Sequence, residues 1–170
     1  MQTPSKILDN AVEQLSSLPG IGKRSALRLA LHLLKRNEHE IHDFANAIID
    51  LKLNVINCKE CGNISDQPVC DICLNPNRSS EIICVVEDIR DIIAVESTGA
   101  FKGKYHVLGG VISPMDGIGP NDLNIQPLLE KVNSKKVEEI IFALSPTMEG
   151  DTTNFYLYKK LKEYAPLITT

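Results

Sequence analysis

Two pairs of cysteines carry the most specific chemistry in this chain. Cys58 and Cys61 form the first pair, Cys70 and Cys73 form the second, and eight residues separate the pairs. A Cys-x-x-Cys pair lets two thiolates converge on one cation from a tight turn, and two such pairs complete the four-sulfur shell of a structural zinc site. Gly62 can supply the positive φ that turns backbone amides toward sulfur. The sequence therefore predicts one zinc ion in a compact knuckle.

Other uses of these thiols fit the sequence less well. Two disulfides would require an oxidising compartment, yet the chain opens without an apolar signal segment and is long enough to form a core without staples. A thioredoxin-like redox site needs one Cys-x-x-Cys pair at a strand-to-helix junction, not two pairs in a polar loop. The fifth cysteine, Cys84, lies in the apolar run 82–86 and is interpreted as a buried thiol.

A second motif, LPGIGKRSA at residues 18–26, separates two segments of helical periodicity and is typical of a helix-hairpin-helix. Gly20 and Gly22 permit backbone angles closed to other residues and bring amides close to a phosphate. The second helix starts at the hairpin, so its dipole faces the bound anion, and Lys23, Arg24 and Arg28 add positive charge. We predict DNA contact by these five residues without base recognition. The alternative is a tight turn that only joins two packed helices.

The charge of the chain is distributed unevenly. The formal net charge is -4, which argues against a general nucleic-acid binder, but six bases and only two acids occur in the first 36 residues, and eleven acids face six bases over 86–151. A chain polarised in this way can place one end on phosphates and offer the other to a basic partner. No apolar stretch is long enough to cross a bilayer, so we expect a soluble protein of the cytoplasm.

Hydrophobic periodicity predicts the elements that hold these motifs. Helical patterns at 7–15, 27–34 and 38–53 predict a small helical domain whose last helix completes its core. After the cysteines the pattern changes to strands at 82–86, 105–112, 140–144 and 167–168, alternating with helices at 88–96, 123–132 and 153–164. Near-continuous apolar strands alternating with helices predict an α/β domain with a mainly parallel sheet.

Several motifs, in this order, closely resemble the RecR family of bacterial recombination mediators. They are LPGIGKRSA at 18–26, the double Cys-x-x-Cys, ICVVE at 83–87, YHVLGG at 105–110, ISPMDGIGP at 112–120 and PTMEGD at 146–151. The resemblance implies a multidomain α/β protein with a helix-hairpin-helix domain at 1–54, a four-cysteine zinc finger at 55–78 and a Rossmann-like Toprim domain at 79–170. It also implies a ring-shaped clamp around DNA that acts with RecO and RecF to load recombinase at gaps. RecR-like proteins continue past the position of Thr170, so we expect this chain to lack the family's last segment.

The Toprim resemblance raises an enzyme as the main alternative. In topoisomerases and primases of that fold, a glutamate after the first strand handles protons and an Asp-x-Asp pair followed by a glutamate holds magnesium. Glu87 matches the first position, but Ser145 and Thr147 stand where the two aspartates should be. Magnesium needs anionic oxygen ligands, so we predict a protein without catalytic residues. A zinc-stapled adaptor whose hairpin binds protein is a further alternative.

Five acids of the Toprim-like region have two interpretations. They are Glu87, Asp88, Asp91, Glu149 and Asp151. They could form an ordinary solvated edge, the commonest fate of charged residues. If they cluster at one end of the sheet, they would repel DNA and attract basic proteins, which matches the partner-binding role that the RecR resemblance implies. That resemblance also implies a bacterial protein that associates with the nucleoid during repair.

Overall fold

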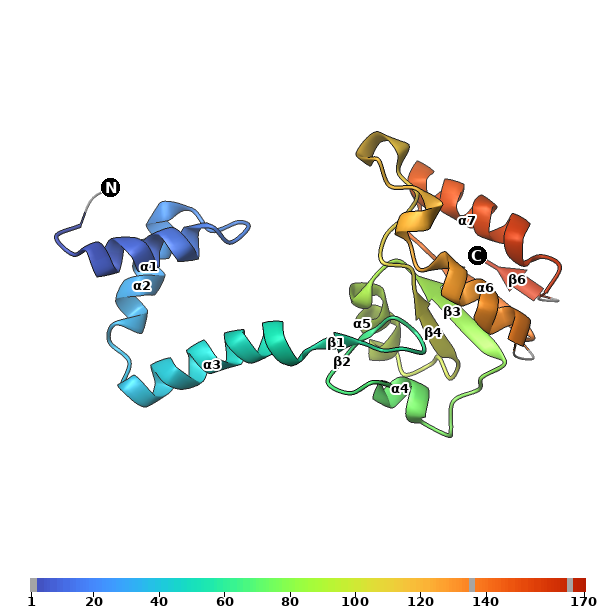
Figure 1. The fold of residues 1–170 in the computed structure, drawn as a ribbon, viewed down its shortest axis with the longest axis horizontal. Helices are drawn as coiled ribbons and strands as arrows, with labels where there is room; N and C mark the ends of the chain where they lie inside the picture. The colour runs from blue at the N-terminus through green and yellow to red at the C-terminus, as the bar shows by residue number, and fades with distance from the viewer. Residues whose placement is uncertain (1–2, 135–136, 165–166) are drawn as a thin grey trace. The chain divides into compact units, whose positions relative to one another are not determined.

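The computed structural model describes residues 3–134, 137–164 and 167–170. The chain divides into two units, Met1–Asn54 and Val55–Thr170, which are described separately (Figure 1). Among the described residues, no helix is long and apolar enough to span a membrane.

The first unit is helical. It contains α1 (Lys6–Ser16), α2 (Lys23–Leu33) and α3 (Glu38–Asn54). Ser5 caps α1 by accepting a hydrogen bond from the Leu8 amide at 3.3 Å. Helices α1 and α2 pack on each other, and α2 buries two small side chains, Ala26 and Ala30. Small side chains let two helices approach closely, so this pair forms the core of the unit.

The third helix differs from its predicted role. It forms where the pattern at 38–53 predicts it, but it buries none of its side chains. Its first turn carries Ile41, its one half-buried residue, and apolar side chains farther along, such as Phe44 and Ile48, are exposed. The expectation that this helix completes the helical core is therefore wrong. Apolar periodicity predicts which face of a helix can pack against another element, but it does not show that such an element is present.

The second unit starts with the cysteine segment and continues into a parallel sheet. Short strands β1 (Ile56–Asn57) and β2 (Ile64–Ser65) pair antiparallel, and α4 (Asp71–Leu74) follows. The sheet has the order β4-β3-β5-β6, with all neighbours parallel. Its strands are β3 (Ile82–Val86), β4 (Lys104–Val107), β5 (Glu139–Ala143) and β6 (Leu167–Thr169).

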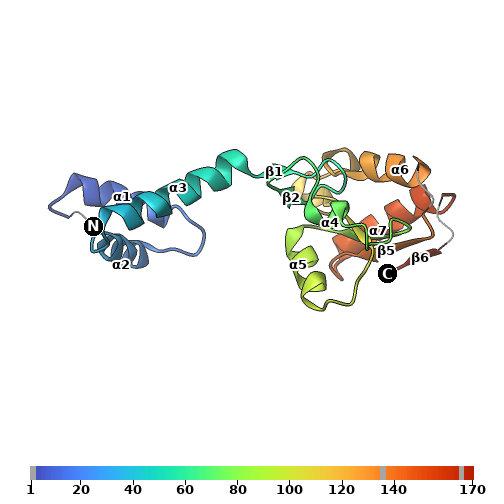
Figure 2. The same ribbon diagram turned by 90° about the horizontal axis from the view of Figure 1, so that it is seen from below.

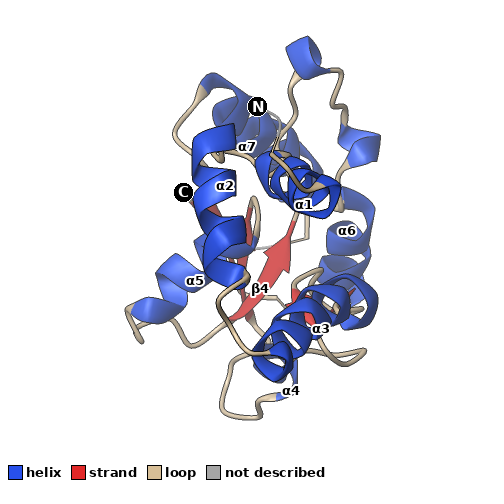
Figure 3. Ribbon diagram, turned by 90° about the vertical axis from the view of Figure 1, so that its left-hand side faces the viewer, coloured by secondary structure: helices blue, strands red, loops and turns tan. Residues whose placement is uncertain are grey.

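Helices cover both faces of this sheet, as the continuous apolar strands predict. Residues Ile83 and Val85 of β3 face the core formed with α6 (Ile125–Ser134) and α7 (Met148–Leu161). The alternate residues Cys84 and Val86 face α5 (Ile89–Ser97). Figures 2 and 3 show α5 and α6 on opposite sides of the sheet. Cys84 is buried as expected, and burial raises the pKa of its thiol to about 11.

Two boundaries of the α/β region differ most from the sequence prediction. The strand expected at 105–112 ends at Val107, since Gly109 and Gly110 follow with φ values of 86° and 152° that no strand accommodates. The helix expected at 153–164 starts at Met148, because Thr147 caps it by accepting a hydrogen bond from the Gly150 amide at 3.1 Å. Between β4 and α6 the chain forms two single-turn helices, η1 (Pro114–Asp116) and η2 (Pro120–Asp122).

Candidate metal centre, nucleic-acid interface and acidic edge

The four predicted cysteine ligands meet in one cluster. All four thiols are buried, and their sulfur atoms lie within 4.8 Å of one another. The Sγ atoms of Cys61 and Cys70 are 3.6 Å apart, close to the separation of about 3.8 Å that tetrahedral zinc imposes with Zn–S bonds of about 2.3 Å. None of the five cysteines forms a disulfide. The cluster is therefore a site for a single metal ion, and zinc is the ion that this donor set selects.

Local backbone geometry brings the two cysteine pairs together. The Cys58 carbonyl accepts a hydrogen bond from the Gly62 amide at 2.9 Å, which closes the turn of the first pair. Gly62 has a φ of +76°, the left-handed conformation expected of it. The second pair lies at the start of α4, where the Cys70 amide donates to the Cys58 sulfur at 3.3 Å. Each pair thus presents its sulfurs from a tight turn.

The protonation of the four thiols depends on how close they lie to one another. A hydrogen bond with Cys73 and burial raise the pKa of Cys61, and burial raises the pKa of Cys70. The hydrogen bond from Cys61 lowers the pKa of Cys73 to about 6. Four buried thiolates would repel one another without a cation. Coordination of a divalent ion removes this conflict, because it favours the thiolate at every ligand.

The cysteine knuckle is fastened to edge strand β4. The Val107 amide donates to the Cys61 carbonyl at 2.7 Å, and the Lys104 ammonium donates to the Cys73 carbonyl at 3.0 Å. A side chain at Gly62 would place its Cβ 3.1 Å from the Val107 carbonyl oxygen, so this close approach also favours glycine. The knuckle and the sheet therefore form one packed unit.

The predicted hairpin joins α1 to α2 through a tight turn. The Ile21 amide donates to the Leu18 carbonyl at 3.1 Å, which encloses Pro19 and Gly20. Gly20 has a φ of +78°, as the third residue of a Pro-Gly type II turn requires. Gly22 has an ordinary φ of −80° and is the N-cap of α2. A Cβ at Gly22 would meet nothing within 4 Å, so space is open in front of the helix start.

The start of α2 lies next to this open space. Within the described part of the chain, no side chain caps α2. The first bond inside the helix is donated by the Ala26 amide to the Gly22 carbonyl at 2.9 Å. The preceding N–H groups of a helix have no intrahelical partner, and with the helix dipole they attract anions. The start of α2 therefore has free amides of the kind for which the motif predicts phosphate contact.

The three predicted basic residues lie on two sides of α2. Arg24 and Arg28 are exposed and line one groove of the helix surface. Lys23 lines a different groove, between α1 and α2, together with the acids Asp9 and Glu13. The described residues that line the groove of Arg24 and Arg28 include no acid, so the charged side chains that an anion meets there are basic.

The residues predicted to replace a magnesium site, at the ends of β3 and β5, take part in local hydrogen bonds. Glu87 follows β3 and accepts a hydrogen bond at 2.9 Å from Ser145 Oγ, which follows β5. Thr147 uses its hydroxyl to cap α7. A Cβ at Gly150 would lie 1.9 Å from the Ser145 carbonyl oxygen, so only glycine lets α7 begin this close to the loop. Among the described residues, the cysteine cluster is the one group of three or more ligating side chains with the geometry of a metal site.

Some of the five predicted acids already take part in local hydrogen bonds through their carboxylates. Asp91 accepts hydrogen bonds from the Glu87 and Asp88 amides, each at 3.0 Å, and so caps α5. Asp88 caps the same helix and pairs with Arg90, whose hydrogen bonds lower the pKa of the Asp88 carboxyl.

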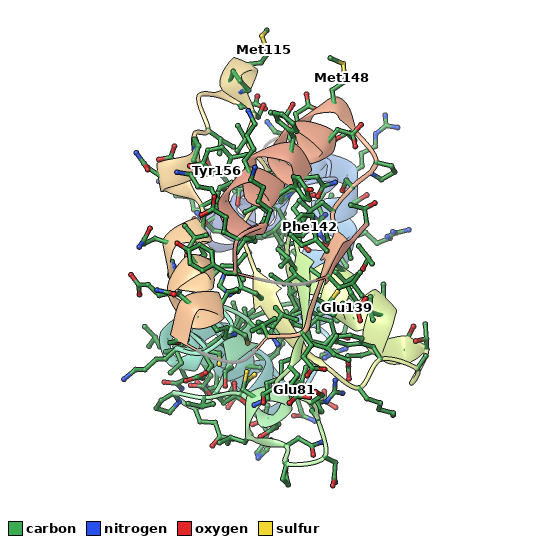
Figure 4. All side chains as sticks on the ribbon, turned by 90° about the vertical axis from the view of Figure 1, so that its right-hand side faces the viewer. Glu81, Met115, Glu139, Phe142, Met148 and Tyr156 are labelled. Carbon is green, nitrogen blue, oxygen red and sulfur yellow. The ribbon has the colours of Figure 1, made fainter. Side chains whose placement is uncertain are left out.

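The other two predicted acids lie at the start of α7. Glu149 is half-buried and Asp151 is exposed, both in the first turn of α7. The sequence reasoning overlooked two neighbours at this end of the unit, the methionines Met115 and Met148, which are 94% and 84% exposed. Figure 4 shows both projecting from the same end, while Phe142 lies inside. The Ile112 amide, which donates to Thr153 Oγ1 at 2.9 Å, holds the η1 loop against α7.

Comparison with known proteins covers nearly the whole chain. Three family models match it: the helix-hairpin-helix of RecR at residues 8–52, the four-cysteine zinc finger domain of RecR at 55–75 and the Toprim domain at 81–169. A recombination protein RecR of Flavobacterium psychrophilum is 56% identical over 163 residues, which are 96% of this chain and 79% of that protein. RecR of Flavobacterium johnsoniae is 55% identical over 170 residues, 100% of this chain and 82% of that protein. RecR of Parabacteroides distasonis is 55% identical over 161 residues, 95% of this chain and 77% of that protein.

Proposed function

Because this chain belongs to the RecR family of recombination proteins, we propose that it is a non-enzymatic, DNA-binding subunit of a clamp in recombinational repair. Several copies associate into a ring around DNA. The ring acts in the bacterial cytoplasm with RecO-like and RecF-like proteins, and it promotes recombinase loading at gaps. The protein associates with the nucleoid while repair is under way.

The hairpin is the observation that carries this proposal. Gly20 provides the positive φ of the turn, Gly22 leaves space beside the start of α2, and no side chain of the described residues caps the first amides of that helix. Arg24 and Arg28 add guanidinium groups that can hold phosphate oxygens in a bidentate manner, and Lys23 adds a third charge beside the hairpin. Contacts of this kind fix the register on a phosphate backbone and carry no base information. DNA is therefore bound whatever its sequence.

The proposal that the protein has no catalytic activity rests on the residues that follow strands β3 and β5. Glu87 is present, as in Toprim enzymes, but its carboxylate accepts a hydrogen bond from the Ser145 hydroxyl. The Thr147 hydroxyl caps α7. Two neutral hydroxyl groups replace two carboxylates, which removes two charges from a magnesium site. The alternative of a magnesium-dependent enzyme depends on Glu87 alone.

The acids that remain at this edge serve protein partners in our proposal. Glu149 and Asp151 are the leading candidates, since Asp88 and Asp91 already cap α5 and Glu87 is engaged by Ser145. Their negative charge attracts basic surfaces and repels DNA. A RecO-like protein with a basic face fits this edge. Such docking weakens as salt increases, because exposed charges are screened within about 8 Å at physiological ionic strength.

Removal of the hairpin cations tests the DNA-binding proposal. Arg24→Ala combined with Arg28→Ala should weaken binding to every DNA sequence alike, and each lost contact should reduce the slope of log affinity against log salt by about 0.9 on duplex DNA. Lys52→Ala, an exposed lysine in the last turn of α3, is the matched control for loss of charge. Full affinity in the folded double variant would contradict the proposal. Binding of a protein ligand by the hairpin, without DNA binding, would instead support a zinc-stapled adaptor.

A further inference from the structure

Helix α2 carries more basic side chains than the hairpin motif uses. Arg24, Arg28 and His32 recur every fourth residue and are exposed, and Lys35 and Arg36 follow directly after the helix. The helical turn continues past Leu33, because the Lys35 and Arg36 amides donate to the His32 and Leu33 carbonyls at 3.1 and 3.0 Å. Residues four apart are neighbours on a helix surface, so these side chains form a row that extends away from the hairpin and turns around the helix by about 40° at each step of four residues.

Arg24, Arg28, His32 and Lys35 line a groove on the open side of α2, whereas Arg36 also lines a groove with Ala30 and residues of α1. The buried residues Ala26 and Ala30 are offset from Arg24 and Arg28 by two positions, about 200° around the helix. The residues from 23 to 36 include no acid. None of the ion pairs found among the described residues involves a side chain of the row. The positive charges of the row therefore remain available to an external anion.

Two adjoining grooves follow the row. The first is lined by Arg24, Leu27, Arg28, Leu31, His32 and Lys35. The second begins at the same His32 and Lys35 and continues with Arg36, Glu40, Asp43 and Phe44. The first groove is thus lined by basic side chains and two leucines, whereas the lining of the second includes two acids.

The spacing of the row suits a polynucleotide backbone. A helix rises about 6 Å over four residues, and the row from Arg24 to Arg36 extends over about 18 Å. A DNA strand advances about 3.4 Å per nucleotide, so about five nucleotides extend along the row. Leu27 and Leu31 in the lining offer an apolar surface to sugars between the phosphates. Each basic side chain can then meet a phosphate without displacing its neighbours.

We propose that the DNA-binding surface continues from the hairpin along α2. Arg24 and Arg28 bind the first phosphates of one DNA strand at the hairpin, and His32, Lys35 and Arg36 bind the phosphates that follow in the same strand. The inference rests on the proposed DNA-binding function and assigns residues that the motif does not include. Glu40 and Asp43 line the groove beyond Lys35, and their charge repels phosphate, so the track ends there.

Two double variants on a length series of single-stranded oligonucleotides test this extension. One combines Lys35→Ala with Arg36→Ala and the other combines Arg24→Ala with Arg28→Ala; Lys52→Ala is the charge control. Affinity is measured by fluorescence anisotropy at several salt concentrations, and circular dichroism checks that each variant folds. On long oligonucleotides, Lys35→Ala/Arg36→Ala should lower affinity on the order of tenfold at 0.1 M salt and reduce the salt slope by about 1.4, two contacts of about 0.7 each.

Oligonucleotide length separates this track from a general effect of charge. Oligonucleotides of about two nucleotides reach only the hairpin, so wild type and Lys35→Ala/Arg36→Ala should bind them equally, while the Arg24→Ala/Arg28→Ala variant should lose affinity at every length. If Lys35→Ala/Arg36→Ala matches wild type on long oligonucleotides while the hairpin variant is weak, the extension is wrong and DNA binding by the hairpin stands. If neither double variant loses affinity, the proposed DNA-binding function itself is wrong.

Discussion

Acidification should destabilise the second unit through one buried imidazole, that of His106 in β4. The side chain is 2% exposed, and Nε2 lies 2.7 Å from the Asn124 carbonyl oxygen. Among the described residues, Nδ1 has no hydrogen-bond partner. Burial lowers the pKa of His106 from 6.5 to about 4 against the opposing effect of the Asn124 hydrogen bond, and Lys131 contributes further lowering. The folded protein therefore holds this ring neutral at pH 7.

The sign of the pH effect follows from the two pKa values. The unfolded chain binds this proton more tightly than the folded one, so the contribution of the neutral ring to stability is complete above pH 6.5 and is lost as the pH falls toward 4. At about 1.4 kcal/mol per pKa unit, the loss reaches about 2 kcal/mol at pH 5 and about 3 kcal/mol at full protonation.

Urea unfolding of wild type and His106→Gln measures this contribution. The glutamine keeps a donor for the Asn124 carbonyl but cannot be protonated. From pH 7.5 to pH 5, wild type should lose about 2 kcal/mol more of its unfolding free energy than the variant does. Zinc content is measured at both pH values to separate metal loss from protonation. Equal losses in the two proteins at constant zinc would refute the assignment to His106.

The remaining predictions concern the knuckle and the hairpin. Cys58→Ser should release the metal and unfold the knuckle, with the loss of on the order of 10 kcal/mol of apparent binding free energy. Cys84→Ala should leave the zinc content unchanged, because that thiol lies in β3. Elemental analysis of the purified variants measures both outcomes. Gly20→Ala should lower stability by about 1 kcal/mol because φ is +78° there. Gly22→Ala, at an ordinary φ, should cost less stability and weaken DNA binding, since its new methyl group occupies the phosphate opening. Equal stability losses in both glycine variants would contradict this hairpin geometry.

The sequence predicts the parts of this protein whose residues interact locally. Two Cys-x-x-Cys pairs dictate one cluster because four buried thiols have few other arrangements. The run 82–86 predicts a strand covered on both faces, and β3 has those bounds. Pro19 and Gly20 encode their own turn. In each case the residue type restricts the backbone or the ligand directly.

Properties that depend on distant contacts could not be predicted in this way. The exposure of α3 depends on what packs against it, which its periodicity does not contain. The hydrogen bond from Ser145 to Glu87 joins residues 58 positions apart through the pairing of β3 with β5. The basic residues from Arg24 to Arg36 can be seen in the sequence as a four-residue repeat. Only the structure shows that they line grooves beside α2.

The central claim is that this protein binds DNA through its hairpin and performs no chemistry on it. Gapped DNA with labelled strands, incubated with the zinc-loaded protein over a range of magnesium concentrations, tests this claim most directly. We predict a salt-sensitive complex and intact strands at every magnesium concentration, because Ser145 and Thr147 leave Glu87 without the anionic partners that magnesium requires. Magnesium-dependent cleavage, joining or synthesis that Glu87→Gln abolishes would contradict the account.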